Sequence, residues 1–399
     1  MLHLDDAATT PVRREALEAM WPYLTAEFGN PSSTHDLGTR AQDGLTRARR
    51  AVAGVLGARA SEITFTAGGT EAANLAIKGL ALADPRGRHL VTSPIEHEAV
   101  TASMDYLVRH HGFEASMVAV DAAGVVRPEA LAHVLRPDTT LVSIAYASNE
   151  IGTVQDLAAL VPLAHQAGAL FHTDAVQAAG WLDLDVRALG VDALTISGHK
   201  VGAPKGVGAA YLRGRLPVEP LVHGGGQERG RRSGTENVAG AVGLATALRI
   251  AEAGRVDDAE TVTVRREAFV TGVLDRVPTA MLTGHRERRL PGHASFCFPG
   301  TAGEAVLLEL ERSGIRCSSG SACAAGRDEP SPALLALGLD PDVAGTAVRM
   351  TFGASVSDAD LDRTATTLAE AVRALTTLGQ GALAEEPPRP AEASAPGVP

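Results

Sequence analysis

The sequence of 399 residues lacks the features of membrane, exported and nucleic-acid-binding proteins. No apolar run reaches the roughly 18 residues that a membrane-spanning helix needs. The chain has 36 Lys and Arg residues against 47 Asp and Glu residues, and its net charge of −11 opposes nonspecific binding to nucleic acid, which depends on basic side chains. The first ten residues contain two Asp and no hydrophobic targeting segment, so no export signal is expected.

Cysteine is also scarce. The three cysteines, Cys297, Cys317 and Cys323, cannot build a disulfide framework, and no two of them form a Cys-x-x-Cys pair. This usage favours a reducing compartment, and we expect a cytoplasmic location. The composition, with 45% hydrophobic and 21% charged residues, is that of a globular protein, and the length predicts two domains.

Short apolar, β-branched runs alternate with helical segments between about residues 60 and 213. We expect strands at 63–66, 89–92, 115–120, 140–146, 169–173, 193–197 and 207–212, and helices at 70–82, 97–110 and 128–135. A further helix follows Asp156, where Pro162 predicts either a kink or a later start. This alternation predicts a mainly parallel sheet covered on both faces, with ligands at the carboxyl ends of its strands.

A glycine turn is the first segment suited to chemistry. Ala67-Gly68-Gly69-Thr70-Glu71 follows an expected strand and opens an expected helix, where free N–H groups can bind an anion. Taken alone, a tight strand-to-helix turn is the simpler interpretation. The spacing matches neither a P-loop nor a dinucleotide-binding fingerprint.

Two further segments follow the carboxyl ends of expected strands. Asp174 and Gln177 lie where a ligand is expected, although Asp174 alone is more typical of a helix cap. In Ser197-Gly198-His199-Lys200, the lysine is suited to forming an imine with a carbonyl cofactor, because partial burial lowers the pKa of an amine and the neutral amine is the nucleophile. The competing interpretation is a surface lysine.

The last two segments are rich in glycine. Residues 223–235 combine glycines with arginines and a hydroxyl, as in an anion-binding loop, but a solvated connection has the same composition. Residues 317–326 set Cys323 among Gly, Ser and Ala, which predicts an exposed, mobile thiol and a candidate nucleophile. Cys297, between two phenylalanines, fits a core thiol, whereas Cys317 fits either the loop or a strand end.

None of these segments is decisive alone. Together they supply an anion cradle, an acid, an imine-forming lysine and a separate thiol. An aldehyde cofactor with a phosphate and a basic ring nitrogen needs the first three, and the set therefore indicates pyridoxal phosphate.

In these segments and their order, the sequence resembles the pyridoxal-phosphate cysteine desulfurases of the NifS/IscS type, within the class V aminotransferase fold. The resemblance runs from residues 4–11 through 29–33 to the region of Arg349, which is nearly the whole chain except the tail. It is carried by Gly69-Thr70-Glu71, Glu96-His97, Asn149-Glu150-Ile151-Gly152, Asp174-Ala175-Val176-Gln177, Ser197-Gly198-His199-Lys200, Arg232-Ser233-Gly234-Thr235 and Ser318-Ser319-Gly320-Ser321-Ala322-Cys323.

The resemblance implies an α/β fold of the pyridoxal-phosphate-dependent transferase (aspartate aminotransferase-like) type. A large domain, expected at residues 15–255, would contain a mainly parallel seven-stranded sheet. A smaller α+β domain would comprise residues 1–14 and 256–378 and carry the cysteine loop. Residues 379–399, with their Pro, Ala and Glu, are expected to form a disordered tail.

The resemblance also implies roles for individual residues. Lys200 would hold the cofactor as an internal aldimine, Asp174 would pair with the protonated ring nitrogen, and His97 would stack on the ring and take part in proton transfer. Asn149 and Gln177 would hydrogen-bond the phenolic oxygen of the ring. The remaining cofactor-binding residues, around the phosphate, would be Gly69, Thr70, Ser197, His199 and, across the interface of a homodimer, Thr235.

For the substrate, the resemblance implies that Arg349 clamps the carboxylate of L-cysteine, helped by Asn149, and that Cys323 attacks its sulfur. The products would be L-alanine and a persulfide on Cys323, which thiolate exchange can pass to a sulfur-acceptor protein such as an iron–sulfur scaffold or a tRNA-thiolation enzyme. No resident metal is expected, although Cys323 could transiently ligate a nascent iron–sulfur cluster.

Two alternatives remain open. Another enzyme of this fold, such as an aminotransferase, a selenocysteine lyase or a β-lyase, would keep the cofactor residues and would not require Cys323. A non-catalytic subunit with a vestigial site is disfavoured, because Lys200, Asp174, His97 and Arg349 are all present.

Overall fold

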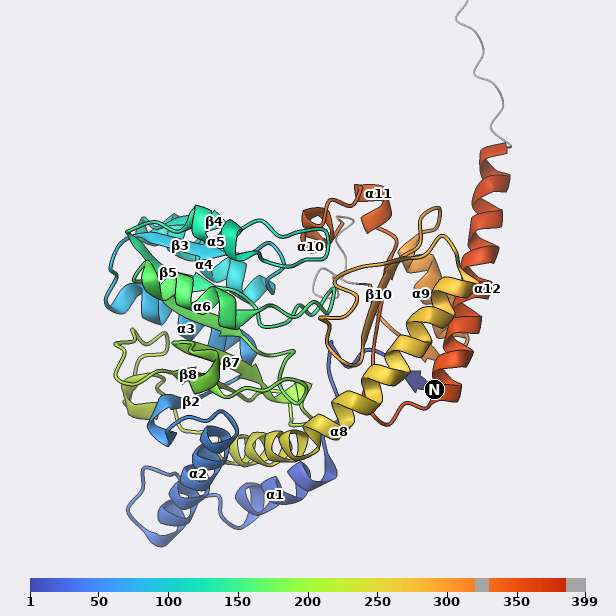
Figure 1. Ribbon diagram of the computed structural model, residues 1–399. Coiled ribbons are helices and arrows are strands. Elements are labelled where there is room, and N and C mark those ends of the chain that lie inside the picture. Colours follow the sequence, from blue (N-terminus) through green and yellow to red (C-terminus); the bar gives the residue numbers. More distant parts are fainter. Residues whose placement is uncertain (320–329, 385–399) are drawn as a thin grey trace, which may run out of the picture.

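The structure is a computed structural model that describes residues 1–319 and 330–384, with backbone only for 378–384 (Figure 1). Its strands are β1 (Leu2–His3), β2 (Ile63–Thr66), β3 (His89–Thr92), β4 (Glu114–Met117), β5 (Thr139–Ser143), β6 (Leu170–Asp174), β7 (Ala193–Ser197), β8 (Gly208–Leu212), β9 (Met281–Leu282), β10 (His293–Cys297), β11 (Ile315–Arg316) and β12 (Ala347–Thr351). Its α-helices are α1 (Arg14–Thr25), α2 (Asp36–Val55), α3 (Gly69–Ala83), α4 (Glu98–His111), α5 (Pro128–Val134), α6 (Leu157–Gln166), α7 (Val186–Leu189), α8 (Val238–Arg276), α9 (Gly303–Arg312), α10 (Pro332–Ala336), α11 (Pro341–Ala344) and α12 (Asp358–Ala384).

The large sheet has seven strands in the order β2-β8-β7-β6-β5-β3-β4. Strands β7, β6, β5, β3 and β4 pair in parallel, and β8 runs antiparallel to both of its neighbours. The predicted α/β fold with a mainly parallel seven-stranded sheet is therefore confirmed. The carboxyl ends of β2, β3, β5, β6 and β7 meet at one edge of this sheet, which is where a ligand is expected.

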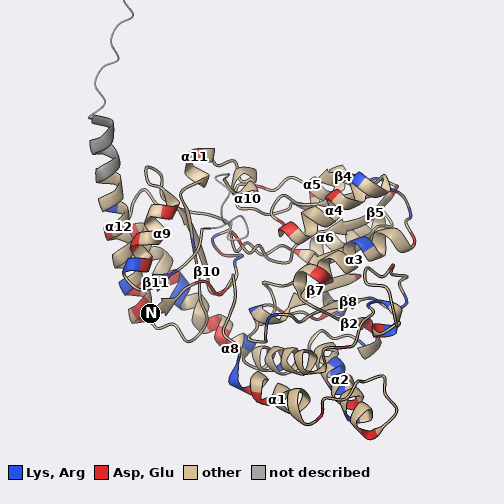
Figure 2. Cartoon of the chain, turned by 180° about the vertical axis from the view of Figure 1, so that it is seen from behind, with Lys and Arg blue, Asp and Glu red and all other residues tan. Residues whose placement is uncertain are grey.

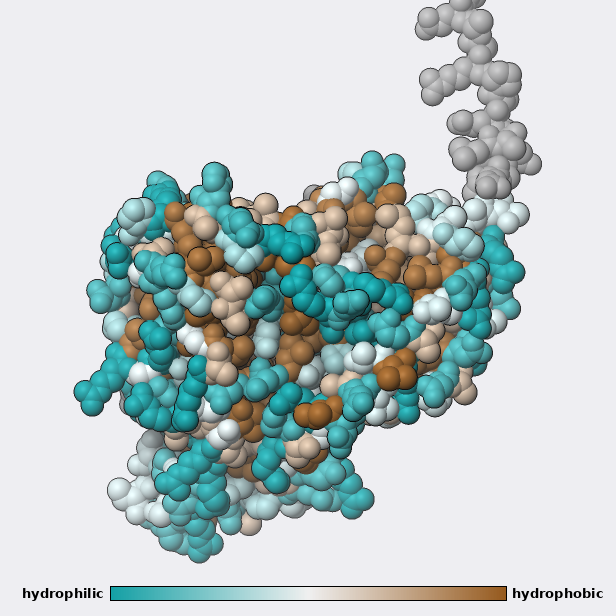
Figure 3. Space-filling model, viewed as in Figure 1, coloured by the Kyte–Doolittle hydropathy of each residue, from teal (hydrophilic) through white to brown (hydrophobic). Residues whose placement is uncertain are grey.

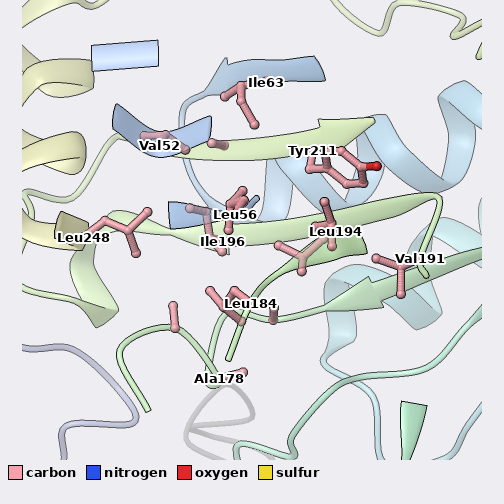
Figure 4. Close-up of a cluster of buried hydrophobic side chains, with 14 of the residues drawn as sticks. Val52, Leu56, Ile63, Ala178, Leu184, Val191, Leu194, Ile196, Tyr211 and Leu248 are labelled. Carbon is pink, nitrogen blue, oxygen red and sulfur yellow. The ribbon is translucent and has the colours of Figure 1, made fainter. Parts of the chain in front are cut away.

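Side chains that alternate along the strands bury both faces of the sheet. Leu194, Ile196 and Tyr211 belong to one core with Val52 and Leu56 at the end of α2 (Figure 4). The intervening residues Ala193, Ala210 and Leu212 belong to a second core with α3 and α4. A buried side chain such as Ile196 contributes about 2 kcal/mol relative to an exposed one, so this two-sided packing fixes the register of the strands.

Most of the predicted strands and helices are present, with different ends. The expected strand 140–146 stops at Ser143, although the N–H groups of Ile144 and Tyr146 still donate to the carbonyls of His172 and Asp174 (3.2 and 2.9 Å). The expected strand 115–120 likewise ends at residue 117, in β4. Irregular backbone that keeps these hydrogen bonds cannot be told from a strand by its apolar pattern.

Pro162 does not delay the start of helix α6. The helix begins at Leu157, directly after Asp156, whose side chain accepts a hydrogen bond from the Ala159 N–H (3.2 Å). The alternative of a later start is therefore wrong. A cap at Asp156 satisfies one of the donors at the helix start, and the proline is tolerated further along.

A second lobe is built from the C-terminal part of the chain and the N-terminal residues. It contains the antiparallel sheet β12-β10-β9 and the parallel pair β1-β11. Its core holds Phe269, Phe296 and Phe352, which pack edge to face with ring centroids 6.2 to 6.3 Å apart around Phe269.

Helix α8 spans 39 residues and joins the two lobes, as its course in Figure 1 shows. Its first half, from Ala241 to Ala251, contributes to the core beneath the large sheet, and Val262, Phe269 and Val273 contribute to the core of the second lobe. The domain boundary at residue 255 falls inside this helix and remains a prediction.

Helix α2 shows why the outer helices form. Its buried residues Ala41, Leu45, Ala48 and Val52 recur at spacings of four and three, which is one face of a helix. The opposite face of α2 is polar (Figure 3), and Lys, Arg, Asp and Glu are spread over both lobes (Figure 2). None of the helices in the described ranges combines the length and apolarity needed to cross a membrane.

The last helix, α12, extends to Ala384 and so passes residue 379, where the tail was expected to begin. No proline interrupts residues 379–384, and the first proline beyond them is Pro387. Residues 385–399, the remainder of the expected tail, lie outside the described residues.

Candidate active site

A cavity of about 770 Å³ lies at the carboxyl ends of the large-sheet strands. Its size is within the range of small-molecule and cofactor sites. Ten of the residues singled out from the sequence line it, although they come from five separate segments and from β12: Gly69, Thr70, His97, Asn149, Asp174, Gln177, Ser197, His199, Lys200 and Arg349.

Two of the predicted site residues are not in this set. Thr235 lines a separate cavity of about 230 Å³, whose wall shares Ala67 and Gly206 with the large one. Within one copy of the chain, Thr235 is therefore next to the site and not in it. Cys323 lies outside the described residues.

The glycine turn forms one wall of the cavity and the start of helix α3. A Cβ atom at Gly69 would lie 2.9 Å from Val176 Cγ2 and 3.1 Å from Ser197 Cβ, so the backbone approaches these residues more closely than a side chain allows. The hydroxyl of Thr66 donates to the carbonyl of Gly68 (2.9 Å) and holds the turn. The first N–H groups of the helix have no acceptor within the helix, which suits an anion in the cavity.

His199 faces the same cavity as a neutral ring. Burial, together with the positive charges of Lys200 and Lys205, lowers the pKa of His199 to about 4. Its Nδ1 is 3.1 Å from the hydroxyl of Thr9, and its backbone carbonyl accepts from Thr10. Lys205, which also lines the cavity, is a cation that the sequence analysis missed, because no pattern distinguishes it from a surface lysine.

Asp174 is buried at the end of β6. Its Oδ1 accepts from the Val176 N–H (2.9 Å), and no helix begins at this turn, so it is not a helix cap. Burial raises the pKa of Asp174, whereas its hydrogen bond and the charges of His97 and Lys200 act in the opposite direction. A cationic group in the cavity would stabilise the ionised form.

Lys200 is held by the N-terminal segment of the chain. Its ammonium donates to the carbonyl of Ala8 (2.6 Å) and to the carbonyl of Ala7, which also accepts from Gln177 Nε2 (3.0 Å). The interpretation as a surface lysine is therefore wrong. Sequence patterns could not predict the contact of Lys200 with residues 7 and 8, because almost two hundred positions separate them.

Arg349 is 1% exposed in the middle of β12. Its Nη2 is 2.9 Å from Asp5 Oδ1, and its Nη1 donates to the backbone carbonyl of Asn149 (3.1 Å). The guanidinium is thus oriented by an acid from the N-terminal segment, which the analysis of local motifs did not identify as a site residue.

His97 precedes helix α4 and lines the cavity. Its Nδ1 accepts from the N–H of Ala99 (3.0 Å), so the ring is fixed as the cap of the helix. The helix is capped at its C-terminal end by Gly112, whose φ of 65° lies in the left-handed region that glycine adopts most readily.

The two described cysteines are structural thiols. Cys297 is fully buried in β10, as predicted, and burial raises its pKa to about 11. Cys317 directly follows β11 and packs against the core of the second lobe, so the strand-end interpretation holds. Burial and the nearby charge of Asp5, opposed by that of Arg349, raise the pKa of Cys317 to about 12, so this thiol stays protonated at neutral pH.

The described residues that flank positions 320–329 form hydrogen bonds close to the cavity. Ser318 exchanges backbone hydrogen bonds with Arg349, at 3.2 and 2.6 Å. The hydroxyl of Ser331 contacts the carboxyl of Glu150, which follows the cavity-lining Asn149. Burial raises the pKa of Glu150, whereas the hydrogen bond from Ser331 and the charge of Arg349 lower it.

A buried ion pair holds the loop that bears Thr235. Arg49 donates both terminal nitrogens to Glu228 (2.6 Å each), and Glu228 also accepts from the Phe65 N–H (3.0 Å). Glu228 and Arg229 have positive φ of 48° and 60°, so the loop is under backbone strain at this point.

Glu228→Ala is expected to lower the free energy of unfolding by about 3 kcal/mol, because it leaves the Arg49 charge buried without its partner. Urea unfolding measures the difference. The matched control is Glu18→Ala, which breaks an exposed pair with Arg14 and should cost less than about 1 kcal/mol. Equal losses in the two variants would contradict the assigned role of the buried pair.

Comparison with known proteins places the chain in a family. The family model described as aminotransferase class-V matches residues 2–364. The cysteine desulfurase IscS of Dictyoglomus turgidum is 42% identical over 378 residues, covering 94% of this chain and 96% of that protein. A solved NifS-like protein has a TM-score of 0.87 at 36% identity and covers 94% of this chain and 100% of its own.

A third relative was solved with a ligand. It is described as SspA in complex with cysteine, with a TM-score of 0.77, 33% identity and coverage of 88% of this chain and 99% of that one. These matches define the family as the class V aminotransferases. The chain belongs to it and, within it, to the cysteine desulfurases.

Proposed function

We propose that this protein is a pyridoxal-phosphate-dependent cysteine desulfurase, which converts L-cysteine into L-alanine and leaves the sulfur as a persulfide on Cys323. The observation that carries the proposal is one cavity that gathers an amine, a buried acid, a histidine and a buried guanidinium: Lys200, Asp174, His97 and Arg349. Membership of the cysteine desulfurase family supports the substrate and the cofactor.

The residues of the cavity fit pyridoxal phosphate. Burial disfavours the ionised form of the Asp174 carboxyl, and a protonated ring nitrogen in the cavity would stabilise that form. The start of α3 lies at the cavity, and a phosphate bound by its free N–H groups would have Thr70, Ser197 and the neutral His199 around it. When bound, the cofactor supplies an electron sink for the negative charge that develops on the substrate.

The chain's own residues then have distinct tasks. Lys200 would hold the cofactor through its amine, and His97 would stack against the ring and move protons. Asn149 and Gln177 would hydrogen-bond the ring oxygen, and the Nε2 of Gln177 donates to the carbonyl of Ala7 (3.0 Å). These roles explain why the cavity combines groups from so many segments.

Arg349 binds the carboxylate of the substrate. Its guanidinium is preoriented by Asp5 and by the carbonyl of Asn149, and a fork of N–H donors matches a carboxylate in two places. The orientation is set before substrate arrives, which reduces the entropy lost on binding.

Arg349→Lys is expected to raise KM for L-cysteine about tenfold or more with a smaller change in kcat, because an ammonium cannot reproduce the two-point contact. Steady-state kinetics measure both constants. Arg316→Lys, at an exposed position on neighbouring β11, is the matched control and should change neither. An unchanged KM in Arg349→Lys would assign carboxylate binding to another residue.

All the atoms exchanged in the sulfur step come from the thiol of Cys323 and from the substrate. The Cys323 thiolate attacks the substrate sulfur, the S–S bond forms, and the Cβ–S bond breaks. The electron pair stays with the former Cβ, which takes up a proton and becomes the methyl group of alanine. Cysteine plus one thiol thus gives alanine plus one persulfide, with no external oxidant.

The length of chain before Cys323 supports this role. Ser318 is fixed to Arg349 by two backbone hydrogen bonds, and Cys323 is five residues further on. Five residues span at most about 18 Å when fully extended. A chain of this length is sufficient for the thiol to act at the wall that carries Arg349.

The partners follow from the same proposal. Thr235, next to the cavity of its own chain but outside it, would complete the phosphate site of a second subunit in a homodimer. The persulfide would pass to a sulfur-acceptor protein, and a cytoplasmic location is the one expected from the cysteine usage.

The proposal is tested by incubating the pyridoxal-phosphate-loaded protein with L-cysteine and a thiol reductant. Equal amounts of alanine and sulfide are expected. A keto acid in place of alanine would identify an aminotransferase, and no turnover by a protein that binds the cofactor would overturn the proposal.

A further inference from the structure

Glu96 is a buried carboxyl that the chemistry described so far does not use. It immediately precedes His97, between β3 and α4. Its Oε1 accepts from the hydroxyl of Ser93 (2.5 Å) and from the backbone N–H of Ala145 (2.9 Å). The side chain therefore ties the segment that leads into His97 to the residue two positions past the end of β5.

This tie lies directly behind the cavity wall. Ile95 and His97, on either side of Glu96 in the sequence, both line the cavity, and so does Ala145. The next residue, Tyr146, donates its N–H to the carbonyl of Asp174 (2.9 Å). Glu96 thus joins the segment that carries His97 to the strand end that leads to Asn149, and Tyr146 joins that strand end to Asp174.

The surroundings of Glu96 favour its neutral form. Burial raises the pKa of Glu96 to about 8, the hydrogen bonds from Ser93 and Ala145 oppose this, the charge of Asp174 raises the pKa and that of His97 lowers it. Its Oε2 has no hydrogen-bond partner among the described residues. Two ionised carboxylates this close repel each other, and Asp174 is the one that faces Lys200 and the cavity.

We propose that Glu96, as a neutral carboxylic acid, is the positioning residue that fixes His97 against the cavity wall. The proposal rests on the proposed function, because it assigns to Glu96 the support of a cofactor-stacking histidine. A charged carboxylate at this position would be a second buried anion beside Asp174, and a truncated side chain would leave the N–H of Ala145 unpaired.

The first test is a double-mutant cycle on the dissociation constant of pyridoxal phosphate from the apo-protein. Glu96→Ala is expected to weaken binding about tenfold in the wild-type background and less than about twofold in His97→Ala, since it acts through that ring. Glu96→Gln, which keeps the acceptor without a charge, should stay within about twofold of the wild type. Glu98→Ala, which removes an exposed acid two residues further along the chain, is the matched control and should have no effect.

Three results would overturn the proposal: no effect of Glu96→Ala, the same loss in both backgrounds, or Glu96→Gln as damaging as Glu96→Ala. Failure of the wild-type protein itself to bind pyridoxal phosphate would instead remove the proposed function. The two failures are therefore distinguishable.

The second test needs only Glu96→Gln and reports the neutral state. The pKa of Glu96 is about 4.5 in the unfolded chain and is raised to about 8 in the folded protein. Between these two pH values the unfolded chain releases the proton and the folded protein keeps it. The wild type therefore loses stability relative to Glu96→Gln as the pH rises through this range. The apo-protein Tm measured from pH 5 to 9 should show a difference that grows to about pH 8 and is constant above it. Parallel Tm curves would show that Glu96 is ionised and overturn the proposal.

Discussion

A Cys323→Ala variant is expected to lose desulfurisation of L-cysteine by about 10³-fold or more. The reason is chemical: without this thiolate no S–S bond can form, and the sulfur stays on the substrate. Binding of pyridoxal phosphate should be unchanged, because the cavity residues that would hold it are elsewhere in the chain. Alanine formation and the absorption of the bound cofactor are measured on the same preparation.

The other two cysteines provide the controls. Cys317→Ser and Cys297→Ala should retain the activity of their folded fraction, because burial raises the pKa of both thiols and keeps them protonated. Wild-type activity in Cys323→Ala, or a comparable loss in Cys317→Ser, would move the nucleophile to a different residue.

A Lys200→Ala variant is expected to lose activity by about 10⁴-fold or more and to lose the covalent attachment of the cofactor. The amine of Lys200 is the group that the carbonyls of Ala7 and Ala8 hold at the cavity, so its removal leaves no other nucleophile in that position. Borohydride treatment followed by mass spectrometry should label Lys200 in the wild type.

Lys205→Ala is the matched control for Lys200. Lys205 lines the same cavity, and its removal should weaken phosphate binding without preventing covalent attachment. Labelling of Lys205 in the wild type, or a labelled lysine in Lys200→Ala at the wild-type level, would show that the imine-forming residue was assigned incorrectly.

The fold was predictable because the sheet is buried on both faces. Strands such as β3 and β7 are short, apolar and β-branched, and turn residues bound them, so their pattern stands out from that of the helices between them. Strand ends were less predictable. Beyond Ser143 the chain keeps its apolar pattern and its hydrogen bonds to β6 while it leaves regular strand geometry.

The site was predictable where a functional side chain lies at the end of a strand or just past it, as Asp174 and Lys200 do. Contacts between distant segments had no local signal. The bonds from Lys200 to Ala7 and Ala8, and from Arg349 to Asp5, join residues about two or three hundred positions apart. The motif around residue 5 was visible only as a resemblance, and its physical task became clear from the contact with Arg349.

The environment of buried carboxyl groups was the second feature that the sequence did not predict. Glu96 belongs to a recognisable Glu-His pair. The sequence does not show that its carboxyl is buried, that it accepts a hydrogen bond from the backbone of another strand end, or that the charge of Asp174 acts on it. Such effects depend on tertiary packing, which determines burial and hence the pKa.

The central claim is that sulfur moves from L-cysteine to one thiol of this chain. The most direct measurement is a single turnover of the pyridoxal-phosphate-loaded protein with L-cysteine, followed by peptide mass spectrometry and quantification of alanine. The account predicts one additional sulfur atom on the peptide that contains Cys323 and an equal amount of alanine. Alanine formed without sulfur on that peptide, or sulfur found on Cys297 or Cys317 instead, would contradict it.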